Sequence, residues 1–308
     1  MISSRRGAGR PRPEMILIVF FAVLSSCVAG PDPKRPAPAG RRAAVVDVAA
    51  LHKEIIAKLA GAEDVQPGRR LSNRAAPENK AAARAYLVDL WRRLGLDVET
   101  RDYSAEGQNI YSVLPAEAPS AEFILVGAHY DTAGNSPGAN DNASGVALVT
   151  AAAAEMRRVP ARARHLMFIL FDEEERGLRG SRAFARKLQE ENRTVHSVHT
   201  IDQIGWDRDG DRAVELEIPY DGALDLYLGA ARAQSVPIPV QTTSEAGSDH
   251  SAFRRLGFRA VGLTEEYRGG DTTPHIHRPT DTFETIDFEY LGSSTKLVVA
   301  VLRSLVRR

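Results

Sequence analysis

This sequence has little cysteine, no excess of either charge and no long hydrophobic run, and each of these properties excludes certain structures or functions. It has one cysteine, Cys27, in 308 residues, so no disulfide can form within the chain. Neither charge is in excess, because forty lysines and arginines balance forty aspartates and glutamates. That balance excludes a general attraction to nucleic acid, and we expect no nucleic-acid partner. Long hydrophobic runs are also missing: the apolar run at residues 15–24 is too short to cross a bilayer as a stable helix.

The amino-terminal residues have the pattern of an export signal. Arginines precede the apolar run at residues 15–24, which ends in Leu24-Ser-Ser-Cys27. This ending resembles the bacterial lipobox, whose cysteine carries the lipid of the mature protein. We therefore predict a signal peptide over residues 1–27, lipidation of Cys27, and an exported protein anchored in the bacterial cell envelope, at its periplasmic face or surface. The alternative is an ordinary signal peptide cut after Ala29, which gives a periplasmic or secreted protein.

The rest of the chain divides into a tether and one domain. Residues 28–45 include four prolines at residues 31–38, and such a segment forms neither a helix nor an internal strand. From residue 46 to 308 there is no second linker and no repeat, so one folded domain is the simplest partition. We expect a monomer.

The hydrophobic pattern of that domain predicts an α/β fold. Periodicity and end signals predict helices at residues 48–59, 78–94, 144–157, 181–190, 223–233, near 251 and 288–306. Strands are predicted at residues 97–102, 109–114, 123–127, 166–171, 195–204, 213–218 and 260–264. The alternation and the nearly continuous apolar strands predict a three-layer α/β/α sandwich around a mixed, mostly parallel sheet. The early strands without helices indicate an antiparallel edge.

Residues with metal-binding side chains lie at the carboxyl ends of three of the predicted strands. They are His129, the acids Asp172 to Glu175, and Asp202. The carboxyl ends of parallel strands meet at one edge of a sheet, where such folds bind ligands. An aspartate in an apolar strand, such as Asp202, needs a cation or hydrogen-bond donors. Imidazoles and carboxylates brought together in this way are typical of hydrolytic zinc sites.

Six segments, taken in order, carry a family resemblance. They are G-A-H-Y-D-T, P-G-A-N-D-N-A-S-G, D-E-E-E-R-G-L-R-G-S, I-D-Q-I-G, G-S-D-H-S-A-F and I-H-R-P-T-D-T. Over residues 75 to 290 the sequence resembles the M28-type di-zinc aminopeptidases, a family that also contains glutaminyl cyclases and glutamate carboxypeptidases. The resemblance implies that residues 46–308 are a zinc peptidase domain with a zinc-exopeptidase-like fold. It also implies two zinc ions per chain and peptide substrates with a free N-terminus.

The same resemblance implies a set of metal ligands. His129 and Asp202 would bind one zinc ion, and Glu175 and His277 the other. Asp141 would bridge the two ions and precede a cis peptide bond. Each ion would then keep open positions for water and substrate.

The run of three glutamates contains the implied general base. Aligning the family's glutamate pair on the following G-L-x-G-S makes Glu174 the base and Glu175 the ligand, with Glu173 as a spacer. A register displaced by one residue would shift these roles. Asp131 would accept a hydrogen bond from His129 and fix its tautomer.

Other assignments concern the substrate pocket and the choice of histidine. Asp249 and His250 match a pocket-lining motif of the family. Tyr267 either lines the pocket or is an exposed tyrosine of a loop, and the sequence favours neither. His275 competes with His277 as the ligand, and the R-P-T-D-T that follows favours His277. The alternatives to an aminopeptidase are a glutaminyl-peptide cyclotransferase and a non-catalytic, surface-anchored binding protein.

Overall fold

The structure of the protein is a computed structural model that describes residues 45–234, 238–267 and 270–307. The predicted signal peptide with Cys27, and the tether up to residue 44, lie outside these residues. The described residues belong to one structural unit. None of the helices found among them combines the length and the apolar character that crossing a membrane requires.

The centre of the fold is an eight-stranded sheet with the order β1-β2-β4-β3-β5-β8-β6-β7. The strands are β1 (Val98–Asp102), β2 (Gln108–Leu114), β3 (Glu122–His129), β4 (His165–Phe171), β5 (Thr194–Ile201), β6 (Val214–Glu217), β7 (Val240–Thr243) and β8 (Ala260–Thr264). Strands β4, β3, β5 and β8 run parallel to one another. Strands β1 and β2 form an antiparallel edge, as the sequence predicts. The sheet is therefore mixed and mostly parallel.

Both faces of the central strands are buried, which explains their nearly continuous apolar sequences. Alternate residues of β3 and β4 enter two separate hydrophobic clusters, one on each face of the sheet. The first cluster receives Ile124, Val126, Ala128, Leu166, Phe168 and Leu170. The second receives Phe123, Leu125, Met167, Ile169 and Phe171.

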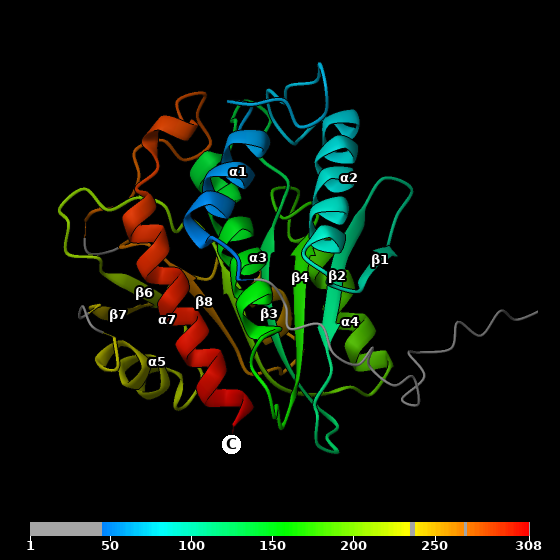
Figure 1. The fold of residues 1–308 in the computed structure, drawn as a ribbon, viewed down its shortest axis with the longest axis vertical. Coiled ribbons are helices and arrows are strands. Elements are labelled where there is room, and N and C mark those ends of the chain that lie inside the picture. Colours follow the sequence, from blue (N-terminus) through cyan, green and yellow to red (C-terminus); the bar gives the residue numbers. More distant parts are fainter. Residues whose placement is uncertain (1–44, 235–237, 268–269, 308) are drawn as a thin grey trace, which may run out of the picture. The chain divides into compact units, whose positions relative to one another are not determined.

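Helices cover both of these faces (Figure 1). On the first side lie α1 (Val48–Leu59), α2 (Pro77–Arg93), α3 (Gly145–Met156), α5 (Ala223–Arg232) and α7 (Phe288–Val306). On the second side lie α4 (Arg179–Glu190) and α6 (His250–Arg254). A kinked turn, η1 (Ala139–Ser144), leads into α3, and the backbone angles of Asp141 and Asn142 within it are not helical. A short 3₁₀ helix, η2 (Phe283–Thr285), precedes α7. The predicted three-layer α/β/α architecture is confirmed.

The structure differs from the sequence-based expectation at the edge formed by β6 and β7. Strand β7 was not predicted, because it has four residues, follows Pro239 and is half exposed. Strand β6 pairs antiparallel with β8, so antiparallel pairing occurs at this end of the sheet as well. The strand predicted for residues 195–204 ends at Ile201, which leaves Asp202 just beyond it.

Candidate metal centre

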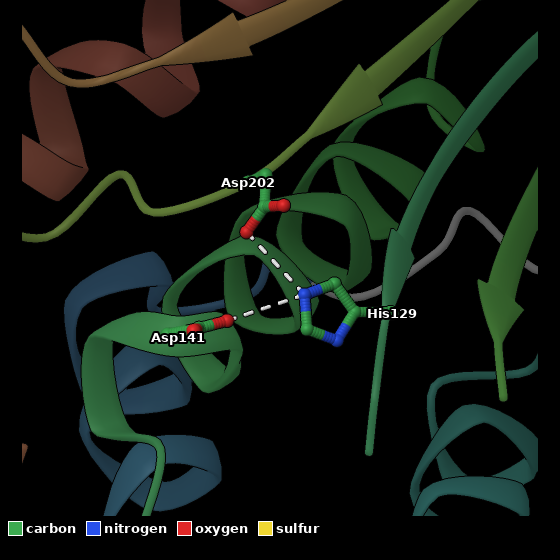
Figure 2. Close-up of side chains that lie close together, drawn as sticks. All are labelled: His129, Asp141 and Asp202. Atoms are coloured by element: carbon green, nitrogen blue, oxygen red, sulfur yellow. Dashed lines mark hydrogen bonds and ion pairs between the residues drawn. The ribbon is translucent and has the colours of Figure 1, made fainter. Parts of the chain in front are cut away.

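The first group of candidate ligands lies where β3 and β5 end. His129 is the last residue of β3, and its Nε2 lies 3.3 Å from Oδ1 of Asp141 and 3.3 Å from Oδ1 of Asp202. Figure 2 shows both carboxylates directed at the same ring nitrogen. The ligand atoms of the three residues lie within 4.8 Å of one another. His129 and Asp141 are buried, whereas Asp202 is partly exposed.

The second group shares Asp141 with the first. Nε2 of His277 lies 3.1 Å from Oδ2 of Asp141 and 3.1 Å from Oε2 of Glu175. The two oxygens of Asp141 therefore face different histidines. The arrangement is that of a bridging carboxylate between two adjacent sites, each with one imidazole and one further carboxylate.

The backbone around Asp141 is held by buried polar side chains. The peptide bond from Asp141 to Asn142 is cis, as the family resemblance implies. The amide groups of Asn140 and Asp141 donate to the carboxylate of Asp281, at 2.8 and 3.0 Å. The side chain of Asn142 donates to the backbone oxygen of Ile201 at the end of β5. Asp281 was not among the predicted site residues, although it lies in the R-P-T-D-T segment.

Asp131 connects the histidine with the loop that follows β4. Its Oδ1 lies 3.4 Å from Nδ1 of His129, and its carboxylate accepts the backbone N–H groups of Glu174 and Glu175 at 3.0 and 3.2 Å. Asp131 thus lies beside the imidazole and fixes the backbone of the two glutamates.

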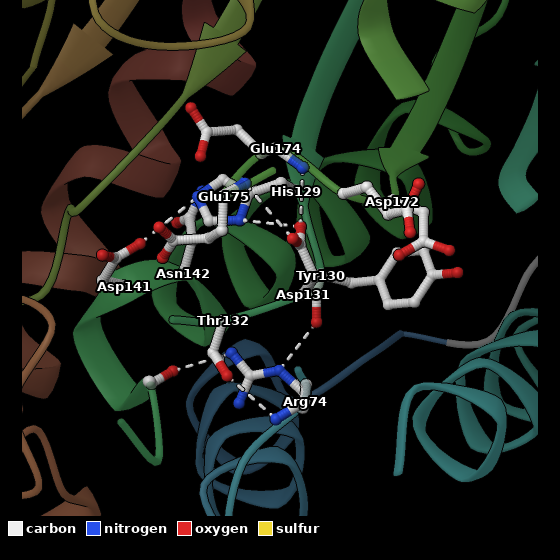
Figure 3. A network of polar contacts seen from close by, with 12 residues as sticks. Arg74, His129, Tyr130, Asp131, Thr132, Asp141, Asn142, Asp172, Glu174 and Glu175 are labelled. Atoms are coloured by element: carbon white, nitrogen blue, oxygen red, sulfur yellow. Dashed lines mark hydrogen bonds and ion pairs between the residues drawn. The ribbon is translucent and has the colours of Figure 1, made fainter. Parts of the chain in front are cut away.

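The acids after β4 separate into two pairs with different surroundings. Asp172 and Glu173 are buried beside the amine of Lys80, at 3.2 and 3.1 Å. Figure 3 shows the carboxylates of Glu174 and Glu175 on the side of His129 and Asp141, with Asp172 directed the other way. Glu173 therefore lies outside the metal centre, and Glu174 and Glu175 lie in it.

A buried arginine that the sequence analysis did not single out supports the same region. Arg74 is fully buried, and its guanidinium donates to the backbone oxygens of Leu59, Tyr130, Pro137 and Gly138, at 2.7 to 2.9 Å. It joins the end of α1 to both ends of the segment between β3 and η1, and η1 carries Asp141. Figure 3 shows Arg74 below Tyr130 and Asp131.

The electrostatic environment of the centre favours positive charge. Burial alone lowers the pKa of His129, but the surrounding carboxylates, Asp202 foremost, outweigh burial and hold the pKa well above its usual value. Hydrogen bonds to Asp141 and Glu175 raise the pKa of His277 to about 10. Protons and metal cations are stabilised by the same negative potential, so the pKa shifts of both histidines indicate a site suited to cations.

The surroundings of Glu174 disfavour the charged form of its carboxyl group. Burial, together with the charges of Asp202, Asp249 and Asp131, raises its pKa to about 10, although the charge of His129 acts in the opposite direction. Added positive charge beside Glu174 would favour its carboxylate form.

The remaining predicted site residues lie in three different settings. Asp249 is buried and contributes to the potential at Glu174. His250 is buried at the start of α6, with Nδ1 3.4 Å from Oε2 of Glu217. Tyr267 is 43% exposed. Nδ1 of His275 lies 2.9 Å from the hydroxyl of Thr280, and His275 belongs to neither group of candidate ligands.

The donor set fits zinc. Each group offers one imidazole nitrogen and carboxylate oxygens, which are common zinc ligands, and each leaves coordination positions for water or substrate. The shared Asp141 is suited to two ions at neighbouring positions.

Comparisons with known proteins place this geometry in context. Residues 109–302 match the model of Peptidase family M28. A probable leucine aminopeptidase of Trichophyton verrucosum is 28% identical over 71% of this chain and 63% of its own length. Aminopeptidase YwaD of Bacillus subtilis is 29% identical over 65% of this chain and 45% of its own length. The chain thus spans about half to two thirds of the length of these relatives.

Solved structures share the fold. The LapA aminopeptidase of Legionella pneumophila superposes with a TM-score of 0.70 at 25% identity, over 85% of this chain and 75% of LapA. BSAP, a zinc aminopeptidase from Bacillus subtilis, gives a TM-score of 0.60 at 26% identity, over 65% of this chain and 50% of BSAP. A glutaminyl cyclase of Porphyromonas gingivalis gives 0.66 at 17% identity, over 84% and 98% of the two chains, a likeness of fold alone.

Proposed function

The chain belongs to peptidase family M28, as its six sequence motifs predict, and from this premise we propose that it is a zinc-dependent aminopeptidase. The observation that carries the proposal is the carboxylate of Asp141, shared by two imidazole and carboxylate groups beside Glu174. The matched relatives and the solved zinc aminopeptidase support it.

Two zinc ions per chain would occupy the two groups of ligands. His129, Asp141 and Asp202 would hold one ion, and Asp141, Glu175 and His277 the other. When bound, zinc lowers the pKa of water and polarises a carbonyl group.

Glu174 is the proposed general base. It accepts a proton from the attacking water and returns it to the leaving amine, the double role that hydrolysis of an amide requires. Asp131 holds both Glu174 and the imidazole of His129, so one carboxylate sets their relative positions. A substrate with a free N-terminal amine is supported by the matched relatives, which are aminopeptidases.

The test is a panel of three substrate types with zinc-loaded protein that contains residues 46–308. Aminoacyl anilides with a free amine should be hydrolysed, and the same anilides with an acetylated amine should not. Peptides with N-terminal glutamine report on cyclisation.

Each contrary outcome has a distinct meaning. Efficient cyclisation of the glutamine peptides without anilide hydrolysis would replace the proposal with a glutaminyl-peptide cyclotransferase. Fully metallated protein that turns over no substrate of the panel would contradict any peptidase assignment and favour a binding protein.

We also propose that the chain is exported and anchored through a lipid on Cys27. The proposal is supported by the basic and apolar residues before Cys27 and by the absence of another cysteine. In a bacterial host, labelled fatty acid should be incorporated into the wild-type chain and not into Cys27→Ser. Equal labelling of the two proteins would contradict the proposal.

A further inference from the structure

The four consecutive acids after β4 are divided by a buried lysine. Lys80 lies in the first turn of α2, and its amine contacts Asp172 and Glu173 but neither of the next two glutamates among the described contacts. The side chains of Lys80, Asp172 and Glu173 are each at most 2% exposed. Glu174 and Glu175 continue on the opposite side, toward His129 and Asp141 (Figure 3).

The chain changes direction at Glu173, in an unusual conformation. Its φ is +56°, in the left-handed region that residues with a side chain adopt at a cost. Contacts on all sides hold it there. The hydroxyl of Tyr103 donates to its carboxylate at 3.3 Å, the amine of Lys80 lies 3.1 Å away, and its backbone oxygen accepts the N–H of Arg179.

The same loop is held from the side of the metal centre by Asp131. The backbone N–H groups of Glu174 and Glu175 donate to its carboxylate. The loop therefore lies between two anchors of opposite charge, Lys80 outside the centre and Asp131 within it.

We propose that Lys80 is a positioning residue, which holds Asp172 and Glu173 so that Glu174 and Glu175 face the metal centre. The inference rests on the proposed function, because it concerns the base and a ligand of that site. Without the amine, the described ion pairs of Asp172 would be reduced to the 3.9 Å contact with Arg84. Glu173 would keep the contacts with Arg176 and Arg179, at 3.4 and 3.6 Å. All three are longer than the contacts with Lys80, so the repulsion of the two buried carboxylates and their need for water would move the loop. Lys80 touches neither substrate nor metal in this account and acts only through the loop.

The test compares Lys80→Met with two control variants. Methionine keeps most of the length of the lysine side chain and removes its charge. Lys187→Met removes a half-exposed charge from α4. Val299→Ala, in the buried part of α7, lowers stability without touching the loop.

Three measurements separate positioning from simple stabilisation. In metal-free protein, we expect faster hydrogen exchange at the amides of Glu174 and Glu175 in Lys80→Met than in either control. Zinc affinity, measured by competition with a chelator, should fall about 10- to 100-fold. In the anilide assay kcat should fall by a similar factor, with little change in KM.

A compensating change gives a further test. Lys80→Met with Glu173→Gln removes one of the two carboxylates that Lys80 contacts, so it lowers their repulsion and should recover part of the zinc affinity. If Lys80→Met does not fold, Glu173→Gln alone, which keeps Lys80 paired with Asp172, should show smaller changes in the same direction.

The proposal would be overturned if Lys80→Met matched Val299→Ala in hydrogen exchange, zinc affinity and kcat. It would also be overturned if Glu173→Gln matched the wild type in these measurements. If the wild-type protein hydrolyses no peptide, the proposed function fails on its own. Exchange and zinc affinity would still decide the role of Lys80.

Discussion

At the scale of single residues, the candidate metal centre is supported by buried cations whose described contacts do not include the proposed metal-binding side chains. Arg74 is the clearest case, because its guanidinium satisfies backbone oxygens from three separate segments. A buried carbonyl that loses its donor costs about 1 to 3 kcal/mol.

We predict that Arg74→Met lowers the free energy of unfolding by about 3 kcal/mol or more, because four carbonyl groups lose their donor together. Chemical denaturation of the metal-free protein measures the change. The matched control is Arg93→Met on α2, whose exposed contacts with Asp89 and Glu54 are worth less than about 1 kcal/mol. Similar losses in the two variants would contradict this role of Arg74.

The sequence predicts the residues that meet at the metal centre better than those that support them. The sequence predicts that His129, Asp202 and the acids after β4 lie together, because all of them lie at the carboxyl ends of strands. Arg74 and Lys80 give no such signal, since a lone cation in a sequence is normally exposed. Lys80 and Glu173 are 93 positions apart, and only the folded chain brings them together.

At the scale of elements, the contact between α1 and α7 contains a histidine that must stay neutral. Nε2 of His52 on α1 lies 3.2 Å from the hydroxyl of Thr295 on α7, and both side chains are buried. Burial lowers the pKa of His52 from 6.5 to about 4.

This shift predicts a loss of stability in mild acid. Below pH 6.5 the unfolded chain binds a proton at His52, whereas the folded chain does so only near pH 4, so stability falls as the pH falls through this window. Denaturant titrations at pH 7 and 4.5 should show that His52→Gln loses about 2 to 3 kcal/mol less than the wild type between the two values. Equal losses would show that His52 does not contribute.

The elements themselves were largely predictable. The first helix lies at the predicted residues, and the buried strands β3 and β4 follow from their apolar sequences. Strand β7 was missed because a short edge strand lacks a strong hydrophobic pattern. Strand β6 lies within the strand predicted for residues 213–218, but its antiparallel direction was not predicted, because pairing depends on distant segments. The kinked turn at η1 likewise depends on tertiary contacts, with Asp281 and with the end of β5.

At the scale of the whole molecule, the two ligand groups connect segments that are distant in the sequence. Their members come from β3, η1, the loop after β4, the residue after β5 and the loop before η2. A ligand that binds only the folded state stabilises it by mass action.

Bound zinc should therefore raise the free energy of unfolding of the domain. With zinc at a hundredfold excess over the dissociation constant, one site adds about 2.7 kcal/mol to the free energy of unfolding. Thermal unfolding should shift to higher temperature with zinc and return after chelation. A variant with Asp141→Asn should show a smaller shift, because it weakens both sites, and a shift equal to that of the wild type would argue against a shared carboxylate.

The central claim is that Glu174 performs the chemistry beside two zinc ions that other residues hold. The most direct measurement is the zinc content and anilide hydrolysis of Glu174→Gln next to the wild type. We predict about two zinc ions per chain in both proteins and a fall in kcat of at least about 100-fold in the variant. Near-normal hydrolysis by Glu174→Gln with full zinc content would contradict the account.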